Sequence, residues 1–292
     1  MRVVAFEAGG MAGVGLWNSD ESAIRPFDLT PEEAAAGVLA LVDRDLDGRP
    51  AQLTDRRLAA DQVTLLAAAP RPRRNIFCVG KNYHAHAEEF AASGFDSSAK
   101  AGAVPAHPIV FSKVPETVIP DGAPILIDTS VSEAIDYEVE LAVIVGRAGR
   151  GIAKEDALGH VWGYTLLNDV TARDLQQRHS QWLLGKSQDS FCPMSALAVT
   201  ADEIDLADTQ LRCWINEDLR QDANTAQLIF DVPTLISTIS AGITLLPGDI
   251  IATGTPEGVG IGFDPPRYLK AGDRVRMEIS GIGSLANPVE QV

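Results

Sequence analysis

One strand-like segment constrains this chain more than any other part of its sequence. Residues 136–146 are mainly apolar, rich in valine and isoleucine, and closed by a glycine, which is typical of a buried strand. Side chains two positions apart on a strand point to the same face, so Glu138 and Glu140 should lie side by side, about 6.5 to 7 Å apart. A fold that buries this segment must therefore accommodate two adjacent carboxylates.

A third acid has a similar setting. Asp169 ends a second apolar run, residues 161–168. Carboxylates at the ends or faces of buried strands repel one another unless a cation compensates them, and a hard divalent ion with oxygen ligands suits such a group. The alternative is that Glu138 and Glu140 form the solvated face of an edge strand, which is common in half-buried sheets. The local pattern leaves both interpretations open.

Bulk composition excludes some classes of function. The chain has 292 residues, of which 46% are hydrophobic, so it can bury one large core or two smaller ones. Its net charge of −16 argues against nucleic-acid binding. An acidic surface does not attract an anionic substrate, so a metal ion and local cations would have to capture one.

Cysteine usage and hydropathy predict a soluble, cytoplasmic protein with no membrane partner. Cys78, Cys192 and Cys213 are scattered without metal-type spacing, and they fit buried thiols in a reducing compartment. No apolar run reaches transmembrane length. The first residues become acidic at Glu7, too soon for a signal peptide.

The first part of the chain is predicted to be a small α/β domain. Strand-like runs at 2–8 and 13–18 are separated by glycines, which indicates a hairpin. Thr30 is the expected N-cap of a helix, Glu33 completes a capping box, and the helix should continue to about Asp45.

The remainder is strand-rich and punctuated by glycine. A linker rich in proline and arginine at 67–74 divides the chain into a small domain, 1–70, and a larger one, 71–292. Strands dominate, so we expect a mixed, β-rich α+β fold, as a mixed sheet or a barrel-like arrangement rather than a doubly wound one. Residues 95–107 are expected to form a flexible loop. Further strands are expected at 76–79, 109–113, 250–253, 274–280 and 283–289, and helices at 84–93, 154–158, 171–178 and 232–240.

A histidine and a carboxylate recur at helical spacing in the expected helix 84–93. His86 and Glu89 are three residues apart, so on a helix they are neighbours on one face. A carboxylate beside a histidine fixes its tautomer and raises its basicity, as a water-activating base requires. His84 and Glu88 form a competing pair, and an ordinary exposed helical turn is a third interpretation.

Two further features could take part in binding or catalysis. Lys186 has apolar and aromatic neighbours in sequence, so it suits neutralising a carboxylate or an oxyanion, although a surface lysine with a buried stem is the plainer interpretation. Residues 254–260 form a glycine-rich loop whose backbone N–H groups could hold an anion. The loop matches neither a Walker motif nor a dinucleotide fingerprint.

Taken together and in this order, these pieces resemble the fumarylacetoacetate hydrolase family from Asn75 to the C-terminus. The resemblance is carried by four blocks: Asn82-Tyr83-x-x-His86-x-x-Glu89, Asp136 to Glu140, Asn168 to Asp174, and Pro247-Gly248-Asp249 running into Thr253 to Gly260. It implies a β-roll catalytic domain in a homodimer, with Mg²⁺ or Mn²⁺ as cofactor. It implies that the metal is held by Glu138, Glu140 and Asp169, that His86 and Glu89 form the water-activating dyad on a mobile segment, and that Lys186, Gln176 and Thr255 contact the ligand.

The stretch after Lys186 narrows the expected activity. Residues 191–196 lack the Gly-Pro pair of many family members, and they look more like the acylpyruvase and oxaloacetate decarboxylase branch. We therefore expect a metal-dependent hydrolase that cleaves a C–C bond in a 2,4-dioxo acid, of acylpyruvate or fumarylpyruvate type, to pyruvate and a carboxylic acid, in aromatic or sugar acid catabolism. The alternatives are an oxaloacetate decarboxylase, an isomerase of an unsaturated 2-oxo acid, and a metal-holding protein without activity.

Overall fold

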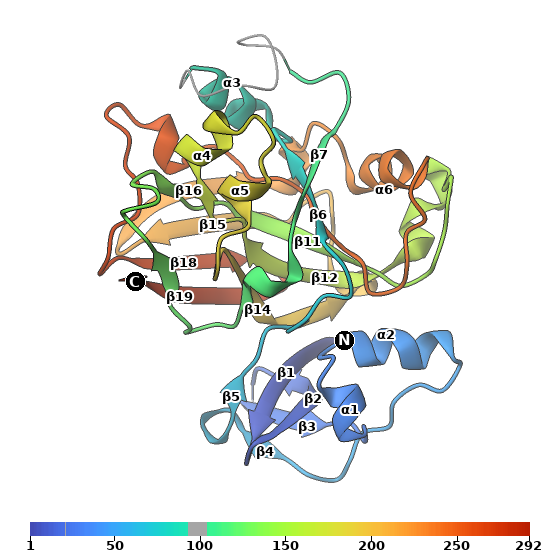
Figure 1. Ribbon diagram of the computed structural model, residues 1–292. Helices are drawn as coiled ribbons and strands as arrows, with labels where there is room; N and C mark the ends of the chain where they lie inside the picture. Colours follow the sequence, from blue (N-terminus) through green and yellow to red (C-terminus); the bar gives the residue numbers. More distant parts are fainter. Residues whose placement is uncertain (21, 93–103) are drawn as a thin grey trace.

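The computed structural model describes residues 1–20, 22–92 and 104–292. Figure 1 shows a strand-rich body with a smaller N-terminal unit, drawn in blue, beneath it. The predicted mixed, β-rich α+β fold is confirmed, because strands dominate and the main sheet combines antiparallel with parallel pairs. Among the described residues, no helix has both the length and the apolar character needed to span a membrane.

The N-terminal unit begins with the predicted hairpin. Strands β1 (Arg2–Ala8) and β2 (Met11–Asn18) pair in antiparallel register. The turn needs glycine, because Gly9 and Gly10 have φ angles of 59° and 78°, in the left-handed region. Three short strands complete this part of the sheet: β3 (Ala23–Pro26), β4 (Leu58–Ala59) and β5 (Thr64–Leu65).

The helix predicted after Thr30 is two helices, α1 (Pro31–Ala34) and α2 (Leu39–Leu46). The capping box of Thr30 and Glu33 is present as expected. The single-helix prediction is wrong because Gly37 adopts a φ of +64°, and a Cβ there would lie 2.2 Å from the carbonyl oxygen of Ala68. The chain therefore bends where the 67–69 segment packs against it.

The N-terminal unit continues the main sheet of the body. Strand β1 pairs with β14 (Cys192–Thr200), Arg2 standing opposite Val199. The segment predicted as a linker is buried at residues 67–69, and the Ala68 N–H donates to the carbonyl oxygen of Ser195 at 2.8 Å. The domain boundary near residue 70 stays a prediction, and at this point the chain is packed rather than exposed.

The main sheet is open, with edges at β4 and β7, so it is not a closed barrel. Its order is β4-β3-β2-β1-β14-β12-β11-β17-β6-β7, with β5 beside β1 and β8 (Val118–Ile119) beside β14. A second sheet has the order β16-β15-β18-β19-β9. The strands not yet bounded are β6 (Ile76–Gly80), β7 (Ile109–Lys113), β9 (Ile125–Ile127), β11 (Val139–Val145), β12 (Val161–Asn168), β15 (Gln210–Ile215), β16 (Asp218–Asn224), β17 (Ile250–Ala252), β18 (Arg274–Ile279) and β19 (Gly283–Gln291).

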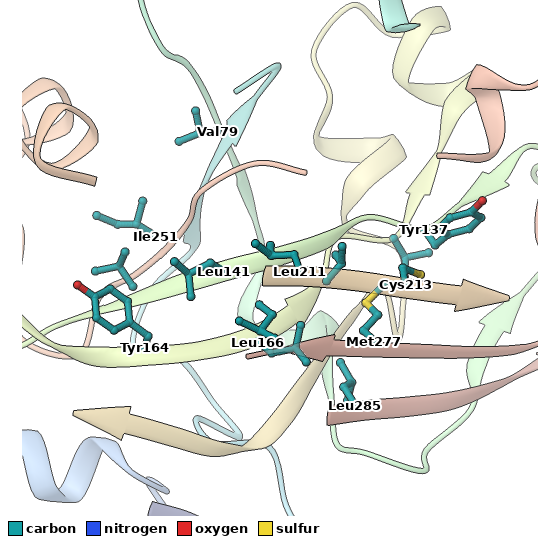
Figure 2. Packing of buried hydrophobic residues seen from close by; sticks show 14 of the residues in the cluster. Val79, Tyr137, Leu141, Tyr164, Leu166, Leu211, Cys213, Ile251, Met277 and Leu285 are labelled. Carbon is teal, nitrogen blue, oxygen red and sulfur yellow. The ribbon is translucent and has the colours of Figure 1, made fainter. Parts of the chain in front are cut away.

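The two sheets enclose the largest hydrophobic cluster. Figure 2 shows Leu141 of β11 and Leu166 of β12 facing Leu211, Met277 and Leu285 of the second sheet. Inward side chains of both sheets are fully or almost fully buried, so this core fixes the strands that end in acidic residues. Burial of this kind is the main force that holds β11 and β12 in place.

The remaining elements lie around the ends of these strands. The predicted strand 136–146 is divided into β10 (Ile135–Asp136) and β11, and β13 (Thr171–Ala172) pairs with β10. In Figure 1, α3, α4 and α5 lie at the end of the body away from the N-terminal unit. The helices are α3 (His84–Ala92), α4 (Arg173–Arg178), α5 (Leu183–Lys186) and α6 (Val232–Ser240), with 3₁₀ turns η1 (Ala60–Gln62), η2 (Pro115–Thr117), η3 (Lys154–His160), η4 (Ala201–Glu203), η5 (Thr225–Gln227) and η6 (Gly260–Gly262).

Two predicted helices differ in detail, and the end of a third lies outside the described residues. The helix predicted at 154–158 is the longer 3₁₀ turn η3, and the one predicted from residue 171 starts at Arg173 because residues 171–172 pair as β13. The end predicted for α3, at residues 93–94, and most of the flexible loop predicted at 95–107 lie outside the described residues.

Candidate active site

The three predicted metal ligands converge at one point. Glu138 directly precedes β11, Glu140 lies within it, and Asp169 follows β12, its pairing partner. One carboxylate oxygen of each lies within 4.8 Å of the others, and all three side chains are buried. Strand β11 lies between β12 and β17, which excludes the solvated edge strand.

Lys186 lies among these acids. Its Nζ donates to Glu138 Oε2 at 2.9 Å and to Asp169 Oδ2 at 2.7 Å. The side chain is 2% exposed, so it is no surface lysine with a solvated head. Burial alone would lower the pKa of the Lys186 ammonium, but Asp169 and then Glu138 raise it above its ordinary value. Lys186 is therefore charged and can donate to an oxygen in the site.

Two more buried cations, for which the sequence predicted no role, also neutralise carboxylates of this site. Lys113, at the end of β7, donates to Asp169 Oδ1 at 2.6 Å. Arg173, at the start of α4, lies 2.7 Å from Glu138 Oε1, and its Nε donates to Asp136 Oδ2 at 2.8 Å. Burial raises the pKa of Glu138, but Lys186 and Arg173 outweigh it and hold the pKa at about 2.

The negative charge of Glu140 is compensated less than the charges of Glu138 and Asp169. Among the described residues its carboxylate has no ion-pair partner, and its hydrogen-bond donor is the backbone N–H of Gly254 at 2.9 Å. Burial, followed by repulsion from Asp169 and Glu138, raises the pKa of Glu140 well above its ordinary value. A cation that contacts all three acids would remove this penalty, and buried carboxylate oxygens at this separation suit Mg²⁺ or Mn²⁺.

The net charge of the buried side chains in this site also favours a divalent cation. When all four of its carboxylates are ionised, as metal binding requires of Glu138, Glu140 and Asp169, this buried cluster with its three cations carries one net negative charge. A divalent ion would reverse that sign. The locally positive site would then attract an anionic ligand into a protein whose net charge is −16. The cluster consists of Asp136, Glu138, Glu140, Asp169, Lys113, Arg173 and Lys186.

The structure also selects one of the two histidine pairs. His86 Nδ1 lies 3.2 Å from Glu89 Oε2 on α3, and His86 is 4% exposed, whereas His84 is exposed. A carboxylate only accepts hydrogen bonds, so Nδ1 carries the proton and Nε2 is the nitrogen that can exchange a proton with a ligand. His86 and Glu89 therefore have the geometry expected of the predicted dyad.

The glycine-rich loop binds anions, and those anions are the protein's own carboxylates. The Gly258 N–H donates to Glu89 Oε1 at 2.9 Å. The N–H groups of Gly260 and Ile261 donate to the two oxygens of Asp136, at 2.6 and 3.1 Å. The loop therefore orients the dyad through Glu89 and the cation Arg173 through Asp136.

Four of the cluster residues and His86 line one pocket, whose empty space of about 280 Å³ is partly open to solvent. The four are Glu138, Glu140, Arg173 and Lys186. The predicted ligand contacts Gln176 and Thr255 line it, and Gln176 Oε1 accepts from Arg173 at 3.2 Å. Besides these residues, its wall includes Lys81 and the aromatic rings of Phe111 and Trp182, whose centroids lie 5.0 Å apart. Four of the five predicted catalytic and substrate residues thus line this pocket, and the fifth, Glu89, contacts it through His86. Their individual roles stay predictions.

Similarity to known proteins identifies the family. Residues 75–290 match the family described as fumarylacetoacetate (FAA) hydrolase C-terminal. This chain belongs to the fumarylacetoacetate hydrolase family. The family predicted from the four sequence blocks is thereby confirmed, and the match starts at the residue where the resemblance begins.

Relatives within the fumarylacetoacetate hydrolase family have different named activities. Oxaloacetate tautomerase YisK of Bacillus subtilis is 45% identical over 229 residues, which are 78% of this chain and 73% of that protein. A fumarylacetoacetate hydrolase from psychrophilic Exiguobacterium antarcticum has 38% identity and a TM-score of 0.81, with 100% of both chains covered. A maleylpyruvate hydrolase from Sphingobium sp. SYK-6, solved with manganese(II) and pyruvate, has 30% identity and a TM-score of 0.75, covering 100% of this chain and 99% of that one.

Proposed function

We propose that this chain is a divalent-metal-dependent tautomerase that interconverts the enol and keto forms of an oxaloacetate-like 2-oxo acid. The reaction moves one proton between the C2 oxygen and C3 and breaks no carbon–carbon bond. The observation that carries the proposal is the cluster of three carboxylates around Lys186, beside a pocket that is also lined by His86 of the His86–Glu89 pair. The 45% identity to a named oxaloacetate tautomerase supports the choice of reaction.

The proposed tautomerase activity is closer to the alternative expected from the sequence than to the activity expected first. The sequence led first to a C–C bond hydrolase and kept decarboxylation or isomerisation as the alternative. The comparisons support the isomerase-type alternative better than the hydrolase, because the relative at 45% identity is named for tautomerisation. The predicted 2-oxo acid ligand is kept, and the predicted homodimer stays a prediction.

The carboxylates Glu138, Glu140 and Asp169 would hold the divalent cation. When bound, that ion supplies Lewis acidity that polarises the 2-oxo group and stabilises negative charge on its oxygen. The Mn²⁺ in the maleylpyruvate hydrolase structure supports an ion of this type for the present chain as well.

The chain's own groups would move the proton. His86, with Nδ1–H directed at Glu89, can accept a proton at Nε2 from one substrate atom and return it to another. Lys186 can donate to the C2 oxygen while charge develops there. The Phe111 and Trp182 rings line the pocket, and apolar walls of this kind would strengthen these electrostatic interactions by displacing water when a ligand is bound.

The proposal is tested by the decay of freshly dissolved enol-oxaloacetate, followed by its ultraviolet absorbance with Mg²⁺ or Mn²⁺. The enzyme should accelerate ketonisation, Glu140→Gln should abolish the acceleration, and Glu133→Gln, a change at an exposed acid of the same segment, should leave it intact. A rate equal to the spontaneous rate in the presence of either metal would exclude the proposed activity.

Hydrolysis of a 2,4-dioxo acid is a second candidate, because the buried His86–Glu89 pair also suits activation of a water molecule. The 30% identity to a maleylpyruvate hydrolase supports it. Pyruvate release from acylpyruvates, measured with the same metals, distinguishes the two activities: a tautomerase ketonises oxaloacetate without releasing pyruvate from a 2,4-dioxo acid.

A further inference from the structure

A buried glutamine next to the pocket has a fixed orientation. Gln221 of β16 is fully buried, and its Oε1 accepts from the Val139 N–H at 3.1 Å. Its Nε2 donates to Thr255 Oγ1 at 2.9 Å and to the Pro256 carbonyl oxygen at 2.8 Å. A backbone N–H can only donate and a carbonyl can only accept, so both ends of the amide are assigned without ambiguity.

This orientation determines what the Thr255 hydroxyl can do. One lone pair of Thr255 Oγ1 is taken by Gln221, so the hydroxyl keeps its proton for another acceptor. Within residues 1–20, 22–92 and 104–292, that hydroxyl donates to no protein acceptor. Thr255 is 2% exposed and lines the same pocket as Gln176 and Lys186. A buried hydroxyl with an unused proton is suited to a ligand oxygen.

The loop that carries Thr255 is held rigidly against β16. Gly258 has a φ of +93°, and a Cβ there would lie 1.8 Å from the carbonyl oxygen of Arg220, next to Gln221. At the other end, the Gly254 N–H is bound to Glu140. These contacts on both sides of Thr255 limit its movement when the bond from Gln221 is removed.

We propose that Gln221 is a positioning residue that fixes the Thr255 hydroxyl as a hydrogen-bond donor to a carboxylate or oxyanion of the bound ligand. The inference rests on the proposed function for the ligand class, a 2-oxo acid. Because Gln221 also binds the backbone between Glu138 and Glu140, one side chain sets Thr255 in register with the predicted metal ligands. The Thr255 hydroxyl and the predicted metal site, each of which would bind one oxygen-bearing group of the ligand, are thereby held at a fixed separation.

The test is the affinity of the Mg²⁺-loaded protein for oxalate, a stable enolate mimic, by calorimetry. Gln221→Met should weaken oxalate binding about five- to tenfold, in the range of one ordinary hydrogen bond. In a Thr255→Val background the same change should have less than about a twofold effect, because the group that Gln221 orients is gone. In a Thr255→Ser background, which keeps the hydroxyl, Gln221→Met should again weaken oxalate binding, as it does in the wild type.

An equal loss of oxalate affinity from Gln221→Met in the wild type and in Thr255→Val would overturn the inference. It would show that Gln221 has only a structural role. If Gln221→Met does not fold, Gln221→Glu keeps the acceptor for Val139 and reverses the group facing Thr255, and it should show the same dependence on Thr255. Gln210→Met, on the neighbouring strand β15, is the control and should leave oxalate affinity unchanged. If the wild-type protein binds no oxalate, the proposed ligand class, a 2-oxo acid, is wrong. The role of Gln221 that depends on this ligand is then wrong too.

Discussion

The carboxylate of Glu89 lies directly against Gly262: a Cβ on residue 262 would come within 1.9 Å of Glu89 Oε1 and 2.2 Å of its Cδ. The Gly258 N–H donates to the same oxygen, Oε1, and the other oxygen, Oε2, faces His86. The absence of a side chain at 262 is therefore a condition for the dyad geometry, although residue 262 lies outside the blocks that identify the family.

The first prediction is that Gly262→Ala disables the dyad without changing either of its members. The backbone is fixed, so the added methyl would displace the flexible Glu89 side chain and break its contact with His86. Ketonisation should slow about a hundredfold, as for loss of a general base, and by a similar factor in Glu89→Gln. Gly242→Ala, at a position where a Cβ meets no atom within 4 Å, is the control. Full activity of Gly262→Ala would refute this geometry.

The second prediction concerns the buried pair of Lys113 and Asp169. Both side chains are 0% exposed and their charged atoms lie 2.6 Å apart. Lys113→Met would leave part of the Asp169 charge uncompensated and should lower the free energy of unfolding by about 3 kcal/mol, measured with urea. Lys154→Met, which removes a half-exposed ion pair with Asp231, should cost less than about 1 kcal/mol. Equal effects of the two variants would contradict the assignment.

The third prediction is a pH dependence in the N-terminal unit. Hydrogen bonds from Arg44, and then from the Thr30 backbone, lower the pKa of Glu33 from 4.5 to about 2. A depressed folded-state pKa stabilises the protein above the unfolded-state value, and this stabilisation is lost as pH falls from about 4.5 towards 2. Arg44→Met should therefore lower Tm at neutral pH, with the difference from wild type shrinking in that window. A difference in Tm that is independent of pH would show that the ion pair contributes nothing.

The fourth prediction is metal-dependent stability. An ion that binds only the folded state raises stability by mass action, by about 2.7 kcal/mol at a hundred times its Kd. Mg²⁺ or Mn²⁺ should raise the Tm of wild-type protein, and chelation should reverse the increase. Thermal scans of Glu140→Gln should show no such shift, and an unchanged shift in that variant would assign the stabilisation to another site.

Short-range patterns in the sequence predicted part of this site. Alternation along a strand predicted that Glu138 and Glu140 share a face, and helical spacing brought together His86 and Glu89. Both are local rules, so they need no knowledge of the fold. The same rules left His84 and Glu88 open, because exposure depends on how α3 packs.

Other parts of the site depend on long-range contacts that no local pattern reveals. Lys113 and Asp169 are 56 residues apart, and Gln221 and Thr255 are 34 apart. The interrupted helix at Gly37 follows from contact with the distant Ala68, although a glycine in a helix was a usable warning. Asp136 belonged to a recognised block, but its role as acceptor for the glycine-rich loop needed coordinates.

The central claim is that Glu138, Glu140 and Asp169 bind one divalent cation. Titration with Mn²⁺, followed by electron paramagnetic resonance of the free ion, tests it most directly. We predict one bound Mn²⁺ per chain in the wild type, one in Glu133→Gln and none in Glu140→Gln at the same concentrations. Undiminished binding by Glu140→Gln, or no binding by the wild type, would contradict the account.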